Sequence, residues 1–185
     1  MKILEIRWHG RAGQGIITVS RLLAEAAFME GKHVQAFPYF GPERLGSPMS
    51  GFTRISDEPI EIHNLIYNPN IVIVLDDTLL RTVSVAEGLQ ADGELLINTK
   101  RGPEEIKKEL DIANKCYTVD ATKISFDIIG SGIAFNTAML GALIQARSIV
   151  SLDSLSKVIL KTFGQDIGQT NVEIMLRSNK EVTGL

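Results

Sequence analysis

The segment with the clearest chemical potential is a glycine-rich run near the amino terminus. It separates an apolar stretch at residues 2–8 from a helical pattern at residues 16–30 and reads Gly10-Arg11-Ala12-Gly13-Gln14-Gly15. Glycine permits a tight turn and the close approach of another group to the backbone. Free N–H groups at the start of the following helix favour an anion, and Arg11 could add a charge-assisted hydrogen bond. The run predicts a turn that holds a phosphate-bearing ligand or a loop of another subunit, unless its glycines serve packing alone.

The spacing of these glycines excludes two common nucleotide sites. Dinucleotide-binding turns read G-x-G-x-x-G, and an acidic residue follows at the end of the second strand. Here the order is G-x-x-G-x-G, and residues 33–37 contain no acid. The Gly-Lys-Ser/Thr of a nucleoside triphosphate loop is absent as well. Nicotinamide and flavin dinucleotides and nucleoside triphosphates are therefore not the expected ligands.

A second unusual segment follows at residues 38–50, which combine aromatic, charged, proline and glycine residues. Connections longer than about 12 residues without regular structure are often functional, and bare aromatic side chains are costly. We interpret this loop as a surface that faces a partner or a ligand. The alternative is a surface loop anchored by its own aromatic residues. The residues predicted to form a subunit interface here are Tyr39, Phe40, Gly41, Pro42, Glu43 and Arg44.

Several polar residues stand where predicted strands end. His9 precedes the glycine turn and is interpreted as a base, a ligand contact or a hydrogen-bonding orienter. Asp76 and Asp77 follow the apolar strand at residues 71–75 and could bind a cation or a hydroxyl, although Asp77 is expected to cap the next helix. No Ser-His-Asp set, carboxylate pair or metal-ligand spacing stands out. We therefore expect no catalytic residue and no metal site on this chain.

The elements that hold these residues alternate between strand and helix. Strands are predicted at residues 2–8, 33–37, 71–75, 94–98 and 115–119, and helices at 16–30, 79–86, 103–110, 136–149, 152–163 and 171–181. Residues 51–56 and 60–62 flank Asp57-Glu58-Pro59 and predict an antiparallel hairpin. The pattern predicts a three-layer α/β fold, in which a mixed, mostly parallel sheet carries helices on both faces. The length of 185 residues fits a single domain over residues 1–185.

Composition narrows the function classes further. With a net charge of −3, the chain has no excess of positive charge to attract the phosphates of a nucleic acid, so a nucleic-acid partner is not expected. The single cysteine, Cys116, excludes an internal disulfide and a cysteine-ligated metal cluster. No stretch reaches the ~18–20 apolar residues of a membrane span, and the charged start lacks a signal-peptide core. We expect a cytoplasmic protein without a membrane contact, and the electron carriers of any redox reaction would lie on other chains.

Taken together, several segments resemble the gamma subunit of 2-oxoacid:ferredoxin oxidoreductases, with the pyruvate enzymes (pyruvate synthase) as the nearest members. The resemblance extends in order over residues 3–145. The segments that carry it are Ile6-Arg7-Trp8-His9-Gly10-Arg11-Ala12-Gly13-Gln14-Gly15, Leu23-Ala24-Glu25-Ala26-Ala27, Val34-Gln35-Ala36-Phe37-Pro38, Phe40-Gly41-Pro42-Glu43-Arg44, Arg54-Ile55-Ser56-Asp57-Glu58-Pro59-Ile60, Val74-Leu75-Asp76 and Asn136-Thr137-Ala138-Met139-Leu140-Gly141-Ala142-Leu143.

The resemblance implies a reaction in which a 2-oxoacid, coenzyme A and oxidised ferredoxin give an acyl-CoA, carbon dioxide and reduced ferredoxin. In this family thiamine diphosphate and the [4Fe-4S] clusters belong to the alpha, beta and delta subunits. This chain would bind no cofactor alone and would carry no complete catalytic centre. It would be an architectural subunit, in which the turn at residues 10–15, the loop at 40–44 and Asn136 face its partners. The CoA diphosphate is the expected occupant of the turn if a ligand rather than a neighbour fills it.

Three departures from the family leave alternatives open. Ala12 stands where glycine is commoner, Leu45-Gly46-Ser47 where an arginine-glycine-alanine run is frequent, and Asp77 where proline is frequent. The uncharged Leu45 removes a contact to an anion or a carboxylate, so the 2-oxoacid is not fixed. Enzymes for ketoisovalerate, oxoglutarate, indolepyruvate or oxalate rival the pyruvate enzyme. The alternative from another class is a nucleotide- or CoA-binding module without redox work.

Overall fold

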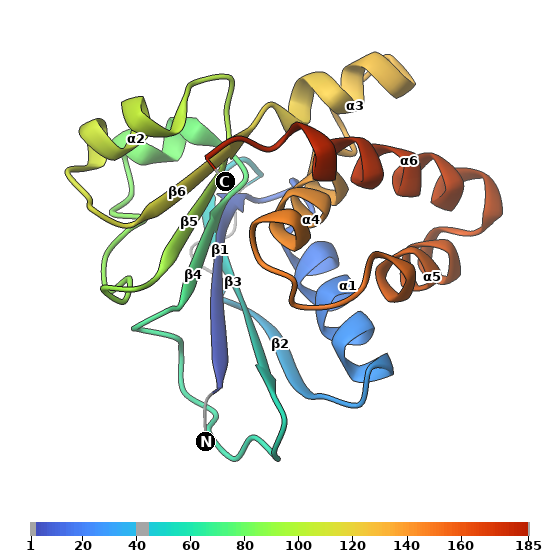
Figure 1. The fold of residues 1–185 in the computed structure, drawn as a ribbon, viewed down its shortest axis with the longest axis horizontal. Helices are drawn as coiled ribbons and strands as arrows, with labels where there is room; N and C mark the ends of the chain where they lie inside the picture. Colours follow the sequence, from blue (N-terminus) through green and yellow to red (C-terminus); the bar gives the residue numbers. More distant parts are fainter. Residues whose placement is uncertain (1–2, 40–44, 185) are drawn as a thin grey trace.

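The computed structural model describes residues 3–39 and 45–184, and within them a six-stranded sheet has the order β2-β3-β1-β4-β5-β6 (Figure 1). The strands are β1 (Leu4–Arg11), β2 (His33–Tyr39), β3 (Pro48–Ser56), β4 (Ile71–Val74), β5 (Glu94–Asn98) and β6 (Lys115–Val119). The helices are α1 (Ile16–Met29), the 3₁₀ helix η1 (Asp77–Arg81), α2 (Pro103–Leu110), α3 (Ala121–Ile129), α4 (Phe135–Ala146), α5 (Leu152–Phe163) and α6 (Gln165–Glu181).

The sheet is mixed and mostly parallel, which confirms the predicted α/β class. β4 pairs with β1, β5 with β4 and β6 with β5, all in parallel. β3 runs antiparallel to both of its neighbours, β1 and β2. Because the four parallel strands point the same way, the residues that follow them meet at one edge of the sheet. We call this edge, formed by the residues that follow β1, β4, β5 and β6, the carboxyl edge.

The side chains of successive residues in the central strands are buried alternately in two separate cores, one on each face of the sheet. Ile71 and Ile73 of β4 are buried with Trp8 of β1 beneath α1, α4, α5 and α6. Val72 and Val74 are buried on the opposite face, in a core that α2 and η1 help to form. A strand buried on both faces needs apolar residues at every position, which accounts for the run of isoleucine and valine in β4. Figure 1 shows the resulting layers, with most of the helical mass on the first face.

The antiparallel pair predicted from the sequence forms between other partners. Residues 60–62 were expected to pair with residues 51–56, but they lie outside the strands. The partner of β3 is β2, in a register that places His33 opposite Ser56. Residues 60–62 instead present backbone carbonyls to side chains of the sheet: Gln35 Nε2 donates to the oxygens of Ile60 and Ile62 at 3.3 and 3.0 Å. This part of the hairpin prediction was wrong because both edges of β3 are paired with other strands, one with β1 and the other with β2.

Three helices differ from the predicted ones. The helix expected at residues 79–86 is instead the 3₁₀ helix η1 (Asp77–Arg81), which ends before Thr82. α3 was not predicted, although its cap was visible: Asp120 accepts a hydrogen bond from the N–H of Lys123 at 2.9 Å. α6 begins at Gln165 rather than at residue 171. The start was missed because its first residues are mostly polar and lack the apolar repeat from which a helix is predicted. Among the described residues, no helix is both long enough and apolar enough to cross a membrane.

Candidate functional site

The candidate site lies at the carboxyl edge, where the order of the strands reverses. β1 leads to β2 and β3 on one side, whereas β4, β5 and β6 lie on the other. In open α/β sheets this reversal leaves a crevice outside the strand ends that is available to ligands. Of the glycine turn, residues 10–15, Gly10 and Arg11 are the last residues of β1 and pair with Met49 and Pro48 of β3, and residues 12–15 connect β1 to α1. The structure therefore brings the turn and the acidic residues after β4 to one place.

Backbone hydrogen bonds join the glycine turn to Gly46 and Ser47, which precede β3. The N–H of Ala12 donates to the carbonyl of Ser47 at 2.9 Å, and the N–H of Gly46 donates to the carbonyl of Ala12 at 3.1 Å. Gly13 is exposed and has a φ of 97°. A Cβ built on it would lie 3.1 Å from Leu45 Cδ1. The turn thus presents bare backbone toward solvent beside an exposed leucine, with room for a group to approach.

Two helix amino termini converge behind the turn. Gly15, with a φ of 77°, precedes α1, and Ala134 precedes α4. Neither of these two preceding residues caps its helix with a side chain, and neither first turn contains an acidic residue. In the first turn of α4, Asn136 Oδ1 accepts a hydrogen bond from the N–H of Thr137 at 2.8 Å. The amide of Asn136 lies against Gly15, so closely that a Cβ at Gly15 would overlap Asn136 Nδ2. The starts of α1 and α4, where the helix dipoles are positive, therefore lie close together, an arrangement that suits an anion.

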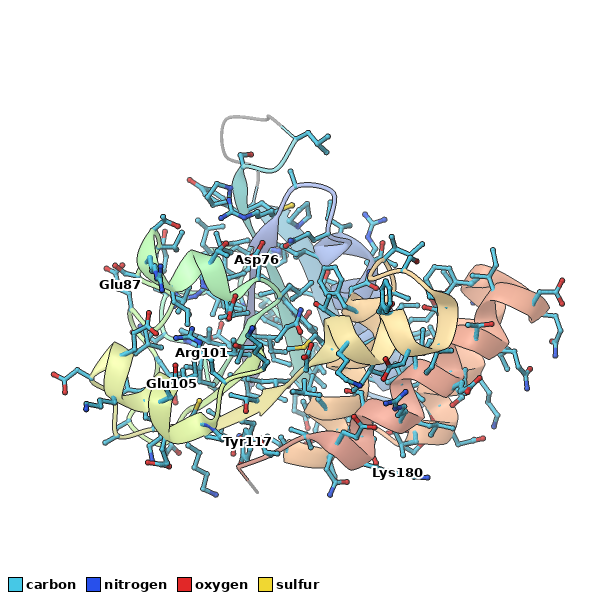
Figure 2. All side chains as sticks on the ribbon, turned by 90° about the horizontal axis from the view of Figure 1, so that it is seen from above. Asp76, Glu87, Arg101, Glu105, Tyr117 and Lys180 are labelled. Atoms are coloured by element: carbon cyan, nitrogen blue, oxygen red, sulfur yellow. The ribbon has the colours of Figure 1, made fainter. Side chains whose placement is uncertain are left out.

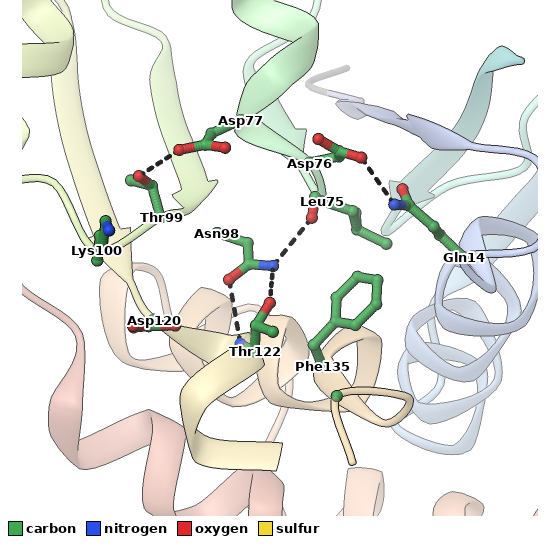
Figure 3. A pocket seen from close by; sticks show the side chains of 11 residues that line it. Gln14, Leu75, Asp76, Asp77, Asn98, Thr99, Lys100, Asp120, Thr122 and Phe135 are labelled. Atoms are coloured by element: carbon green, nitrogen blue, oxygen red, sulfur yellow. Dashed lines mark hydrogen bonds between the residues drawn. The ribbon is translucent and has the colours of Figure 1, made fainter. Parts of the chain in front are cut away.

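Asp76 ties the turn to the end of β4. Its Oδ2 accepts hydrogen bonds from Arg11 Nε at 3.0 Å and from Gln14 Nε2 at 2.9 Å, and the second of these is drawn in Figure 3. Its Oδ1 accepts from the N–H of Thr78 at 3.1 Å. Burial opposes ionisation of Asp76, but hydrogen bonds from Thr78 and Gln14 and the charge of Arg11 outweigh it and lower the pKa of Asp76. Asp76, and not Asp77 as expected, caps η1.

Arg11 is already engaged inside the chain. Besides its ion pair with Asp76, it donates to the carbonyl of Gly46 at 3.1 Å and to Thr78 Oγ1 at 2.8 Å. Gln14 Oε1 accepts from the backbone N–H of Arg11 at 2.7 Å. Each guanidinium nitrogen of Arg11 thus has a partner, although a guanidinium holds five N–H donors. A direct contact between Arg11 and a ligand stays a prediction.

A cleft of about 420 Å³ adjoins the turn at the ends of β4, β5 and β6 (Figure 3). Polar side chains that line it are bonded inside the chain: Asn98 Nδ2 donates to the backbone carbonyl of Leu75 at 3.0 Å, and Thr99 Oγ1 donates to Asp77 at 2.6 Å. Arg101 lies beyond Asp77 and pairs with it and with acidic residues of α2, among them Glu105 (Figure 2). The cleft residues that the sequence did not single out include Phe135 and two of the first three residues after β6, Asp120 and Thr122.

The predicted interface loop is described only in part. Phe40, Gly41, Pro42, Glu43 and Arg44 lie outside the described residues. Tyr39, at the end of β2, has 51% of its surface exposed. Two other large apolar side chains are exposed in segments near the turn, Leu45 at 91% and Ile133 at 77%. Apolar residues left bare beside a functional edge are typical of surfaces that another chain covers.

The side chain of His9 lies on the face of the sheet opposite α1, where it lines a small pocket with Leu79 and Val83. Its Nε2 accepts a hydrogen bond from Arg7 Nε at 3.1 Å, and its Nδ1 lies 3.4 Å from Ser50 Oγ. Burial, and secondarily the charge of Arg7, lowers the pKa of His9 to about 3. His9 therefore stays neutral at physiological pH and acts as a hydrogen-bonding side chain beneath a small pocket that Tyr39 also lines.

The residues of this chain do not fit an iron–sulfur cluster. Cys116 is the only cysteine, it is buried in β6, and burial raises the pKa of its thiol to about 11. A cluster needs about four thiolates. Among the described residues, no group of three or more histidine, cysteine, aspartate or glutamate side chains is placed to hold a metal ion.

Comparison with known proteins places this arrangement in context. The family model described as pyruvate ferredoxin/flavodoxin oxidoreductase matches residues 5–179. The chain is 48% identical over 171 residues to the pyruvate synthase subunit PorC of Methanocaldococcus jannaschii, with 92% of each chain covered. It is 46% identical over 172 residues to the pyruvate/ketoisovalerate oxidoreductases common subunit gamma of Pyrococcus abyssi, also with 92% of each chain covered.

A solved structure supports the same relation. The crystal structure of pyruvate oxidoreductase subunit PORC from Thermotoga maritima superimposes with a TM-score of 0.89 at 44% identity. The match covers 99% of this chain and 98% of that one. The fold, including the carboxyl edge, is therefore shared over almost the whole length of both chains.

Proposed function

This chain belongs to the pyruvate ferredoxin/flavodoxin oxidoreductase family, and on that premise we propose that it is the gamma subunit of a CoA-dependent pyruvate:ferredoxin oxidoreductase. The enzyme would convert pyruvate, CoA and oxidised ferredoxin to acetyl-CoA, carbon dioxide and reduced ferredoxin. The observation that carries this function is the identity of 44–48% to chains named PorC or subunit gamma, over nearly the full length of both partners. It acts as an enzyme subunit and holds no complete catalytic centre.

Within that complex, the turn at residues 10–15 is proposed to contact the diphosphate of CoA. Exposed backbone at Gly13 and the adjacent amino termini of α1 and α4, whose first turns contain no acidic residue, support this role, because backbone N–H groups at a helix start bind phosphate without a dedicated cation. The side chain of Asn136 could donate from Nδ2 beside Gly15. The alternative occupant is a loop of a neighbouring subunit.

The exposed apolar residues near the turn are proposed to face partner subunits. Tyr39 and the adjoining residues 40–44 would contact an alpha, beta or delta chain of the complex, which also passes electrons to ferredoxin. Thiamine diphosphate and the [4Fe-4S] clusters would belong to those chains, since Cys116 alone cannot ligate a cluster. When bound, these groups supply the decarboxylation and electron-transfer chemistry. This chain would supply the carboxyl edge that contacts CoA.

One specific observation favours a second substrate. The relative from Pyrococcus abyssi is named as a subunit common to pyruvate and ketoisovalerate oxidoreductases. A gamma chain of this kind does not select the 2-oxoacid, so the present chain could serve a ketoisovalerate enzyme as well. Selection of the 2-oxoacid would then lie on other subunits.

The proposal is tested by tagging this chain in its native host and purifying it without oxygen. The eluted complex is assayed for ferredoxin reduction with pyruvate, ketoisovalerate, oxoglutarate, indolepyruvate and oxalate, each with and without CoA. We expect pyruvate activity that depends on CoA and elutes with the tag. Pyruvate activity that stays in the unbound fraction, while the tagged chain elutes alone, would contradict the proposed function.

A further inference from the structure

The carboxylate of Asp76 lies beside the proposed anion site, where a negative charge should weaken anion binding. Its two oxygens, however, are fully used inside the chain by Arg11, Gln14 and Thr78. Only 17% of the side chain is exposed. Asp76 therefore has little capacity to bind a ligand directly, and its charge is matched by that of Arg11.

The partners of Asp76 are the residues that shape the turn. Gln14 uses Nε2 on Asp76 and Oε1 on the backbone N–H of Arg11, so it closes the turn from inside. Arg11 reaches from Asp76 to the carbonyl of Gly46 and so joins the turn to the segment that precedes β3. Removal of the carboxylate would release both side chains at once, while the cores on either face of the sheet would keep their contacts.

We propose that Asp76 is a positioning residue for the anion site: it holds Arg11 and Gln14 so that the exposed backbone of Gly13 stays accessible to the ligand. The backbone N–H groups of Arg11, Ala12 and Gln14 are not available to the ligand, because they donate to Gln14 Oε1 and to the carbonyls of Ser47 and Arg11. Asp76 does not touch the ligand, and Arg11 serves as a bridge between two loops rather than as the main attraction for phosphate. This inference rests on the proposed contact of the turn with CoA.

The test uses the assembled complex with Asp76→Asn in this chain. The KM for CoA should rise about tenfold, the effect of losing one or two hydrogen bonds that fix a binding loop, whereas kcat and the KM for pyruvate stay within about twofold. Asp127→Asn is the matched control, because Asp127 also accepts from two cationic side chains, Lys123 and Arg177, but bonds to neither loop. Its KM for CoA should equal that of the wild type.

A double-mutant cycle separates positioning from direct contact. If Arg11 acts through Asp76, Arg11→Lys combined with Asp76→Asn should raise the KM for CoA no further than the worse single variant. If Arg11 binds CoA itself, the two effects should multiply, and that result would overturn the inference. Should Asp76→Asn prevent assembly, Thr78→Val removes one bond to Asp76 and one to Arg11 and should give a smaller rise in the same direction.

The outcomes distinguish this inference from the proposed function. A wild-type complex that reduces ferredoxin with pyruvate and needs CoA, but shows no change in KM with Asp76→Asn or Thr78→Val, leaves the function intact and rejects the positioning role. A wild-type complex without any dependence on CoA rejects the proposed function itself.

Discussion

The side chain of Asn136 occupies the space that a Cβ on Gly15 would need. The two residues are far apart in the sequence, at the starts of α4 and α1, yet they bring the two helix amino termini together at the carboxyl edge. Gly15 also has a φ of 77°, a conformation that L side chains rarely adopt. Glycine is thus required at position 15 for two reasons: the backbone has a positive φ, and the side chain of Asn136 leaves no room for a Cβ.

Replacing Gly15 by alanine should lower the free energy of unfolding by about 2–4 kcal/mol. The left-handed backbone accounts for about 1–2 kcal/mol of this loss, and overlap with Asn136 accounts for the rest. Gly31→Ala is the matched control, because Gly31 has a φ of 83° but no atom lies within 4 Å of the place that its Cβ would take. Urea unfolding of both variants should show the smaller loss at Gly31.

The double variant Gly15→Ala/Asn136→Ala isolates the overlap. It should be more stable than the sum of the two single variants implies, because the shortened side chain at position 136 no longer reaches the new methyl group. Equal losses in Gly15→Ala and Gly31→Ala, together with simple additivity in the double variant, would show that the two residues do not meet as described.

Gly13→Ala should affect ligand use more than stability. Gly13 is exposed, and a methyl group there would project beside Leu45 on the proposed CoA-binding surface. In the assembled complex we expect the KM for CoA to rise about tenfold with kcat little changed. An unchanged KM, with assembly also unaffected, would remove Gly13 from the site. Gly31→Ala again serves as the control for the cost of placing alanine at a position with a positive φ.

The buried His9 should make the fold sensitive to mild acid. Its pKa is lowered to about 3 in the folded chain, whereas an unfolded histidine titrates near 6.5. The unfolded state therefore binds one more proton between these values. The stability that neutral His9 contributes is complete above about pH 6.5 and is lost as the pH falls, by up to about 1.4 kcal/mol per pH unit.

The measurement for His9 is urea unfolding of the wild type and His9→Gln at a series of pH values from about 7.5 to about 5, which spans the titration of an unfolded histidine. The wild type should lose stability more steeply than the variant, which lacks the titrating group. Parallel curves for the two proteins would mean that His9 is protonated in the folded state and that its surroundings do not hold it neutral.

Two buried serines should respond oppositely to the same substitution. Ser178 on α6 is fully buried, and its hydroxyl has no hydrogen-bond partner among the described residues. Ser125 on α3 is equally buried, but its hydroxyl donates to the carbonyl of Ser131 at 2.8 Å and accepts from the N–H of Ala134 at 3.1 Å. Removal of Ser125 Oγ takes a partner from the buried N–H of Ala134 and from the half-buried carbonyl of Ser131, whereas removal of Ser178 Oγ takes a partner from no group in the described part of the chain.

Ser125→Ala should therefore cost about 1–3 kcal/mol, and Ser178→Ala should be neutral or stabilising by up to about 1 kcal/mol, because alanine also favours a helix. Thermal or urea unfolding of the full chain measures both. A loss of similar size in the two variants would indicate that Ser178 has a partner, such as a bound water, in solution.

Local patterns in the sequence were enough for much of the fold. The run of isoleucine and valine in β4 predicted a strand buried on both faces, and α5 was predicted with its Ser151 cap and Gly164 end. The second strand of the hairpin was wrong because strand pairing is a non-local choice: β3 pairs with β2 across the intervening loop. α3 was missed although Asp120 is an ordinary helix cap.

The site was only partly predictable for the same reason. The glycine turn and the acids after β4 were visible as separate features, but their connection through Arg11, Gln14 and Asp76 is tertiary. Capping by Asp76 rather than Asp77 depends on where η1 begins, which the sequence does not mark. The contact of Asn136 with Gly15 depends on how α4 packs beside α1.

The central claim is that the carboxyl edge is completed by a group from outside this chain, and backbone protection at the glycine turn tests it most directly. Hydrogen–deuterium exchange is measured on peptides that cover residues 8–17, in the isolated chain, in the assembled complex and in the complex with CoA. The account predicts slower exchange in the complex than in the isolated chain, and a further slowing when CoA is added. Equal exchange in all three states would contradict it.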